Sequence, residues 1–121
     1  MLVWKVVKKG RTSAIMNGPL TVHYPKGLTV KSKDKRFPLF AFKTPEDAKK
    51  MVSRVSMFNL SIIKCRATRS RSKIKKLVDV YYHKSYSVDD LLHILSENLN
   101  TFDLFKRYPG AVLCSSITPL E

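Results

Sequence analysis

The chain has 121 residues, of which 44% are hydrophobic and 26% are charged. This length and composition suit one globular domain and exclude a disordered tail, because there is enough apolar surface to form a core. The formal net charge of +14 exceeds what solubility requires. It indicates a polyanionic partner, which is DNA, RNA, an anionic membrane surface or an acidic protein. The alternative is a generally basic, soluble surface.

The positive charge is concentrated in the first two-thirds of the chain. Residues 1–76 contain 20 Lys and Arg against three Asp and Glu, a net of +17. Residues 77–121 contain three against six, a net of −3. We therefore expect a polyanion to bind mainly to residues 1–76.

Cysteine content and hydropathy indicate the cellular compartment. Cys65 and Cys114 are too few for a disulfide framework, so we expect buried free thiols, with a bridge between neighbouring strands as the alternative. No apolar run approaches the roughly 20 residues that span a bilayer, and the first residues lack the apolar core of a secretory signal. We expect no membrane span and an intracellular location, in the cytoplasm, nucleoid or nucleus, or incorporation into a virion.

Strands and turns alternate in the first third of the chain. Residues 2–9 predict a strand, and residues 12–16 are expected to return as its hairpin partner. On the first strand we expect the more apolar face to point inward, which carries Leu2, Trp4, Val6 and Lys8. A turn at Pro25–Gly27 is expected to join two paired strands, 20–24 and 28–31.

The clearest local pattern covers residues 37–55. Apolar residues on both faces of 37–42 predict a strand that is buried on both sides. Thr44 is placed to cap the following helix and Pro45 suits its first position. Its apolar face has helical spacing and consists of Ala48, Met51, Val52 and Val55.

The rest of the chain completes a mixed fold. Residues 60–68 alternate, with Ile63, Cys65 and Ala67 predicted to face the core. Residues 73–82 have helical spacing, with a strand over 77–82 as the alternative. We expect a capped helix over 88–99, a short helix or packed loop over 102–108, and a last strand inside the sheet over 111–118. The prediction is one α+β domain, residues 1–121, with a mostly antiparallel sheet of about six strands and two or three helices packed on one face.

A basic run without acidic residues is the strongest functional signal. It comprises Lys64, Arg66, Arg69, Arg71, Lys73, Lys75 and Lys76. A second group could extend it, and consists of Lys26, Lys31, Lys33, Lys35 and Arg36. Arginine binds phosphate through its forked donors and lysine as a point charge, so both groups are predicted to contact a nucleic-acid backbone. The alternative is a solvated, charged loop.

Other chemistry has less support. Tyr81, Tyr82 and Tyr86 lie near the basic run and would stack on bases if exposed, but tyrosines more often pack into a core. The histidines and cysteines do not have a metal-ligand spacing, and there is no nucleophile elbow, Walker loop or dinucleotide fingerprint. We therefore predict no catalytic residue, no metal and no cofactor.

Three short motifs within residues 24–48 resemble a pattern found in other proteins. Tyr24–Gly27, Phe40–Phe42 and Glu46–Ala48 follow an order similar to that in small, mostly uncharacterised phage and viral proteins. Some of these have a fold similar to ADP-ribosyltransferases. The resemblance assigns no catalytic residue, and the same stretch is explained as a turn, a strand and a helix cap.

Three functions follow from these patterns. The first is non-enzymatic binding of nucleic acid through a basic, phosphate-contacting face. The second is a structural or assembly role in a virus particle or large complex, in which the basic face meets an acidic protein or packaged nucleic acid. The third is a small enzyme resembling ADP-ribosyltransferases, which requires a nucleotide pocket with a positioned carboxylate.

Overall fold

The computed structural model describes residues 1–14, 21–34, 36–55, 59–73, 76–78, 89, 93 and 101–121. Its helices are α1 (Pro45–Arg54) and α3 (Leu104–Arg107). Its strands are β1 (Leu2–Lys8), β2 (Thr12–Ser13), β3 (Val30–Lys31), β4 (Leu39–Phe42), β5 (Leu60–Arg69), β6 (Lys76–Val78), β7 (Thr101–Asp103) and β8 (Ala111–Pro119).

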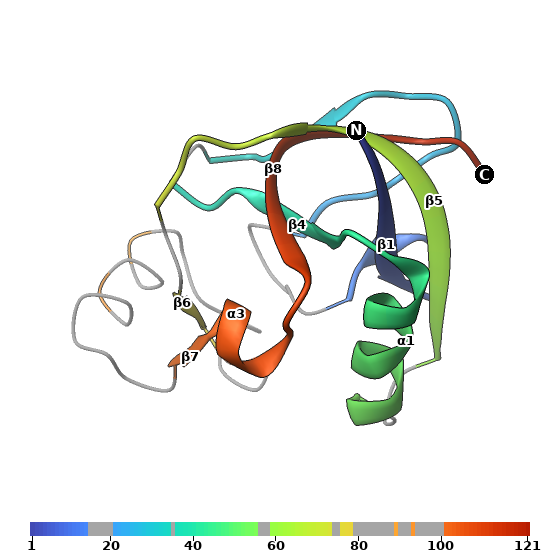
Figure 1. The fold of residues 1–121 in the computed structure, drawn as a ribbon. Coiled ribbons are helices and arrows are strands. Elements are labelled where there is room, and N and C mark those ends of the chain that lie inside the picture. Colours follow the sequence, from blue (N-terminus) through green and yellow to red (C-terminus); the bar gives the residue numbers. More distant parts are fainter. Residues whose placement is uncertain are drawn as a thin grey trace.

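Four long-range strand pairings close the main sheet into a small barrel (Figure 1). Strand β1 pairs with β4, β4 with β8, β8 with β5, and β5 returns to β1, each time antiparallel. Strands β2 and β3 extend the sheet beside β1 and β8, and β6 pairs with β7 separately. The predicted mixed fold with six mostly antiparallel strands in the main sheet is confirmed. The sheet is not open, however, because β5 contacts both β1 and β8 and leaves the four central strands without a free edge.

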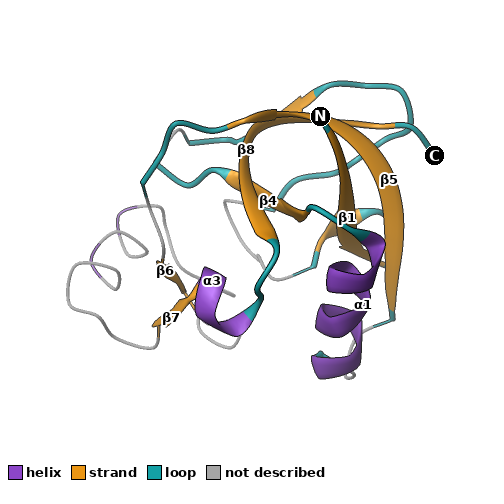
Figure 2. Ribbon diagram, in the orientation of Figure 1, coloured by secondary structure: helices purple, strands orange, loops and turns teal. Residues whose placement is uncertain are grey.

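Alternation along the barrel strands divides the apolar side chains into two clusters. The interior cluster includes Val3 and Val7 of β1, Leu39 and Ala41 of β4, and Cys65 of β5, together with Val22, Tyr24, Ile63, Ala67, Val112, Cys114 and Ile117. The outer cluster lies between the barrel and the two helices and contains Val6, Ala14, Phe40, Phe42, Ala48, Met51, Leu104, Tyr108, Ala111 and Leu113. Figure 2 shows α1 beside β1 and β5, and α3 beside the beginning of β8. Both helices therefore pack on the outside of the barrel.

The strand and cap predicted around residue 40 are confirmed. All four residues of β4 are buried, as expected for a strand covered on both sides. The Thr44 hydroxyl oxygen accepts a hydrogen bond from the Asp47 amide at 3.2 Å, and Pro45 begins α1. Ala48 and Met51 of the predicted helix face are fully buried.

Two expectations about pairing were wrong in part. The turn at Pro25–Gly27 is present, and Gly27 has the positive φ of 81° that such a turn requires. Its two flanks do not pair with each other, because His23 bridges to Thr12 and β3 pairs with β8. Residues 76–78 form a strand and not the expected helix, because they pair with β7. The expected helix over 88–99 lies outside the described residues except for Asp89 and His93, which are both helical.

The prediction of which face of β1 points inward was also wrong. Both faces of the strand are covered, and the other face points into the barrel. The face that carries Val3, Lys5 and Val7 points into the barrel, and the opposite face packs Trp4 and Val6 towards the helices. Lys5 is only 3% exposed. Its Nζ donates to the Phe40 carbonyl oxygen at 2.7 Å and lies 4.3 Å from the centroid of the Phe40 ring. Burial lowers the Lys5 pKa to about 8.

Candidate nucleic-acid interface

The sheet brings the two predicted basic groups together. Residues paired across neighbouring strands point to the same side of a sheet. Thr68 of β5 pairs with Ser116 of β8, which pairs with Lys31 of β3. Arg66 pairs with Thr118, whose hydroxyl lies 2.8 Å from the Thr29 hydroxyl. Two rows of cationic and hydroxyl side chains therefore lie next to each other on the outside of the barrel.

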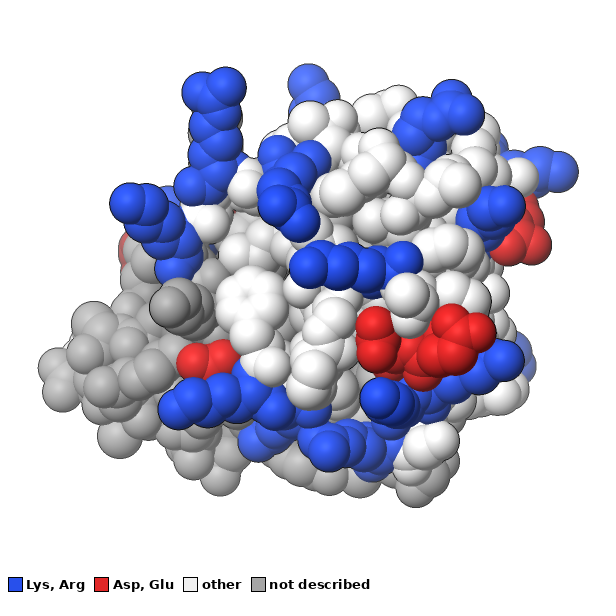
Figure 3. Space-filling model, viewed as in Figure 1, with Lys and Arg blue, Asp and Glu red and all other residues white. Residues whose placement is uncertain are grey.

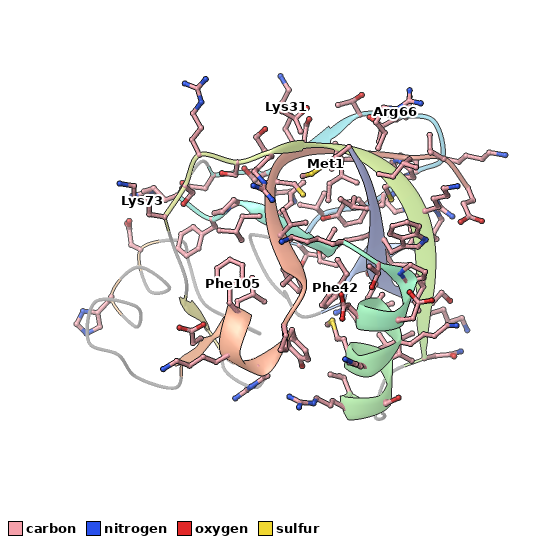
Figure 4. The ribbon with its side chains drawn as sticks, viewed as in Figure 1. Met1, Lys31, Phe42, Arg66, Lys73 and Phe105 are labelled. Atoms are coloured by element: carbon pink, nitrogen blue, oxygen red, sulfur yellow. The ribbon has the colours of Figure 1, made fainter. Side chains whose placement is uncertain are left out.

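We call the exposed cations of this surface the basic face: Lys31, Arg66, Arg69, Arg71 and Lys73. Figure 4 shows Lys31 projecting between Arg66 on one side and Lys73 on the other. In Figure 3, Lys and Arg side chains line this upper edge, and the largest acidic patch in view lies lower, over the beginning of α1. Within the part of the chain that the structure describes, none of the five forms an ion pair.

One hollow of about 710 Å³ opens between β8, β3 and the segment after β5. Two cations of the basic face line it, Lys31 and Arg71. The remaining polar lining is hydroxyl, from Ser32, Ser70, Ser72, Ser115 and Ser116. Guanidinium, ammonium and hydroxyl groups are all donors to phosphate oxygens, so the lining suits an anion with several acceptors.

A second hollow of about 340 Å³ shares Ser70 and Ser72 with the first. It is also lined by Arg69, Lys43 and Phe105, by Gly110, and by the first residues of β8, Ala111, Val112 and Leu113. The segment between the hollows is held by local hydrogen bonds, because the Ser70 amide donates to the Leu113 carbonyl and the Ser72 amide donates to the Ser70 hydroxyl. Neither hollow has an acidic residue among its described lining residues.

Two predicted site residues lie in surroundings that weaken their contribution. Arg36 forms a bidentate ion pair with Asp34, at 2.9 and 2.6 Å. This pairing lowers the pKa of the Asp34 carboxyl to about 2, so the carboxylate keeps its charge and compensates Arg36. The Lys64 amide donates to the Glu121 carboxylate at 2.9 Å, which places a negative charge beside Lys64.

The remaining predicted residues are not part of the described face. Lys33 is exposed in the loop after β3 and lines neither hollow. Lys35, Lys75 and the tyrosines at 81, 82 and 86 lie outside the described residues, and Lys76 is described only as backbone of β6.

Sequence reasoning missed Lys43 and Phe105 as site residues. Lys43 lies between the predicted strand over 37–42 and the helix cap at Thr44, and Phe105 lies in the short helix or packed loop expected over 102–108, and neither was given a binding role. The available signal was Phe105 followed directly by Lys106 and Arg107, an aromatic residue next to two cations. The serines around the hollows were missed because they come from three separate segments of the chain.

The described residues contain neither a candidate metal site nor a membrane-spanning helix. They contain no group of three or more His, Cys, Asp or Glu placed to hold a metal ion. No helix among them is both long and apolar enough to cross a bilayer. Cys65 and Cys114 are free and buried, and burial raises the pKa of each thiol to about 11.

Comparisons with protein-family models, with curated proteins and with solved structures find no match to this chain.

Proposed function

We propose that the chain binds nucleic acid through its phosphates, without catalysing a reaction, and that the basic face is the contact surface. The observation that carries this proposal is the convergence of Lys31 and Arg71 on one serine-lined hollow, from segments 40 residues apart in the sequence. A merely solvated charged loop would not need a partner strand and a row of hydroxyls at the same place.

Salt dependence supplies the test, because each neutralised phosphate releases counterions. With five contacts, the slope of log K against log salt is expected to be about −3.5 on a single strand and about −4.5 on a duplex. The triple substitution Arg66→Ser, Arg69→Ser and Arg71→Ser should flatten the single-strand slope by about 2 and weaken binding.

A matched control removes the same charge elsewhere. Lys9, Lys49 and Lys50 are exposed, and lie at the β1–β2 turn and on α1, away from the basic face. Substituting all three with Ser also lowers the net charge by three. Fluorescence anisotropy with a dye-labelled oligonucleotide should show near-wild-type binding for this control. Equal losses in both triple variants, or no binding by the wild type at low salt, would refute the proposal.

An assembly role is the second candidate, and one observation favours it. Met1, Leu2, Leu28 and Leu120 are 48%, 47%, 61% and 38% exposed. Leu2 pairs with Arg66, and Leu120 donates its amide to the Lys64 carbonyl, so apolar side chains adjoin the basic strand β5. Light scattering tests this role: a concentration-dependent mass that falls after Leu28→Ser and Leu120→Ser supports it, and a constant monomer mass contradicts it. The transferase-like alternative needs a carboxylate in a nucleotide pocket. Among the described lining residues of the two hollows there is no Asp or Glu.

A further inference from the structure

Phe105 has an unusual setting for an aromatic side chain. Of the Phe, Tyr and Trp residues whose exposure the structure describes, it alone is exposed, at 37%. Its backbone is fixed, because the Asp103 carboxylate accepts hydrogen bonds from the amides of Phe105 and Lys106 at 3.0 and 3.1 Å. Figure 4 shows the Phe105 side chain projecting from α3 towards the strands. The backbone that carries the ring is therefore held in place, and the side chain is accessible.

The hollow that Phe105 lines contains cationic and hydroxyl side chains besides the apolar residues at the beginning of β8. Phe105 lines the 340 Å³ hollow with Arg69 and Lys43, and the adjoining hollow contains Lys31 and Arg71. An aromatic platform beside a positively charged groove is the arrangement by which proteins bind unpaired bases and their backbone together. The volume is at the lower end of the range for small-ligand sites, which suits a single flat ring system.

We propose that Phe105 stacks on one base of a single-stranded nucleic acid, while Lys31 and Arg71 hold an adjacent phosphate. This inference rests on the proposed function and makes it specific for single strands. In a duplex both faces of each base are covered by neighbouring base pairs, so the Phe105 ring has no free base face on which to stack. Arg69 lines the 340 Å³ hollow beside Phe105, where its charge would neutralise the strand's phosphate backbone.

Phe105→Leu is the informative variant, because it keeps apolar bulk on α3 and removes the ring. Stacking on one base contributes a factor of about 5 to 150 in affinity, so this variant should bind a thymidine oligonucleotide more weakly by that factor. Phe105→Tyr restores a ring and is expected to restore most of the affinity. Because no charge changes, the salt slope of Phe105→Leu should equal that of the wild type.

Two controls separate stacking from general effects. Leu28→Ala changes another exposed apolar residue, and should leave single-strand affinity unchanged. Duplex affinity should be the same for Phe105→Leu and the wild type. A loss on single strand and duplex alike would overturn the stacking role, as would single-strand binding that Phe105→Leu does not weaken.

A measurement on the wild-type chain keeps the proposal testable even if Phe105→Leu does not fold. An oligonucleotide containing 5-iodouracil is irradiated in the complex, and the attachment site is located by mass spectrometry. Attachment at Phe105 supports stacking, and attachment only elsewhere overturns it. A nucleoside monophosphate is tested as a competitor of the oligonucleotide. If it displaces the oligonucleotide at concentrations near the oligonucleotide Kd, the proposal that the ligand is a nucleic-acid strand is overturned. Absence of binding to both single strand and duplex at low salt would overturn the proposed function itself.

Discussion

The buried Lys5 provides the sharpest test of the fold, through the substitution Lys5→Met. Lowering the Lys5 pKa from 10.5 to about 8 means that the folded protein binds the proton less well than the unfolded chain does. At pH 7 this difference destabilises the fold by about 3 kcal/mol relative to a neutral side chain. Methionine loses the hydrogen bond to the Phe40 carbonyl and the contact with the Phe40 ring, which contribute about 2 kcal/mol together. Lys5→Met should therefore stabilise the protein by about 1 to 2 kcal/mol at pH 7.

The pH dependence distinguishes this explanation from a simple packing effect. The unfolded chain holds more protons at Lys5 between pH 8 and 10.5, so the stability of the wild type gains from this group as the pH rises through that window. Between pH 7 and pH 9 the stability advantage of Lys5→Met should shrink by about 1 kcal/mol. Urea unfolding at both pH values measures the difference, and other titrating groups largely cancel in it.

The control for this experiment is Lys9→Met, which removes the same charge from an exposed residue in the turn after β1. Its effect should stay within about 0.5 kcal/mol at both pH values. Destabilisation by Lys5→Met at pH 7, or a constant difference between Lys5→Met and the wild type from pH 7 to 9, would refute the argument that Lys5 is desolvated in the barrel.

Three further predictions concern the scaffold. Gly110 has a φ of +89°, and a Cβ on it would overlap the Asp47 carboxylate. Gly110→Ala should therefore destabilise the protein by about 2 kcal/mol or more in urea unfolding, and a neutral effect would contradict this backbone geometry. Thr44→Ala removes the cap of α1 and should cost about 1 kcal/mol, whereas Thr44→Ser should cost a few tenths; equal losses would exclude the hydroxyl as the cause. Cys65 and Cys114 should react with a thiol reagent at pH 8 only after denaturation, and fast labelling of the folded protein would contradict their burial.

Much of the secondary structure could be predicted from local patterns in the sequence. The alternation in 60–68 placed Ile63, Cys65 and Ala67 in the core, and all three are buried. The cap at Thr44 was also predictable, because its chemistry involves only the next few residues. Strands and helix starts of this kind depend on residues that are close together in the sequence, so they can be predicted from it.

Closure of the barrel could not be predicted, because it depends on strand pairings between distant segments. Strand β3 pairs with β8 and not with the segment before its turn, a choice that no local pattern decides. The face that carries Lys5 was expected to point outward because the opposite face, with Leu2, Trp4 and Val6, is the more apolar. The methylene chain of Lys5 and its bond to the Phe40 carbonyl accommodate it inside the barrel, and this compensation is visible only in three dimensions.

The candidate site depends on where β5 ends. Simple alternation puts Arg69 on the same face as Cys65 and Ala67, inside the barrel, and its partner Cys114 is an interior residue as well. Arg69 is the last residue of β5, however, and its side chain is exposed. The register shift before it leaves one extra residue on β8, Ser115, opposite the end of β5. Beyond Arg69 the chain passes over the beginning of β8, where the Ser70 amide donates to the Leu113 carbonyl. Ser70 and Ser72 line both hollows, so the end of β5 positions the segment that the two hollows share.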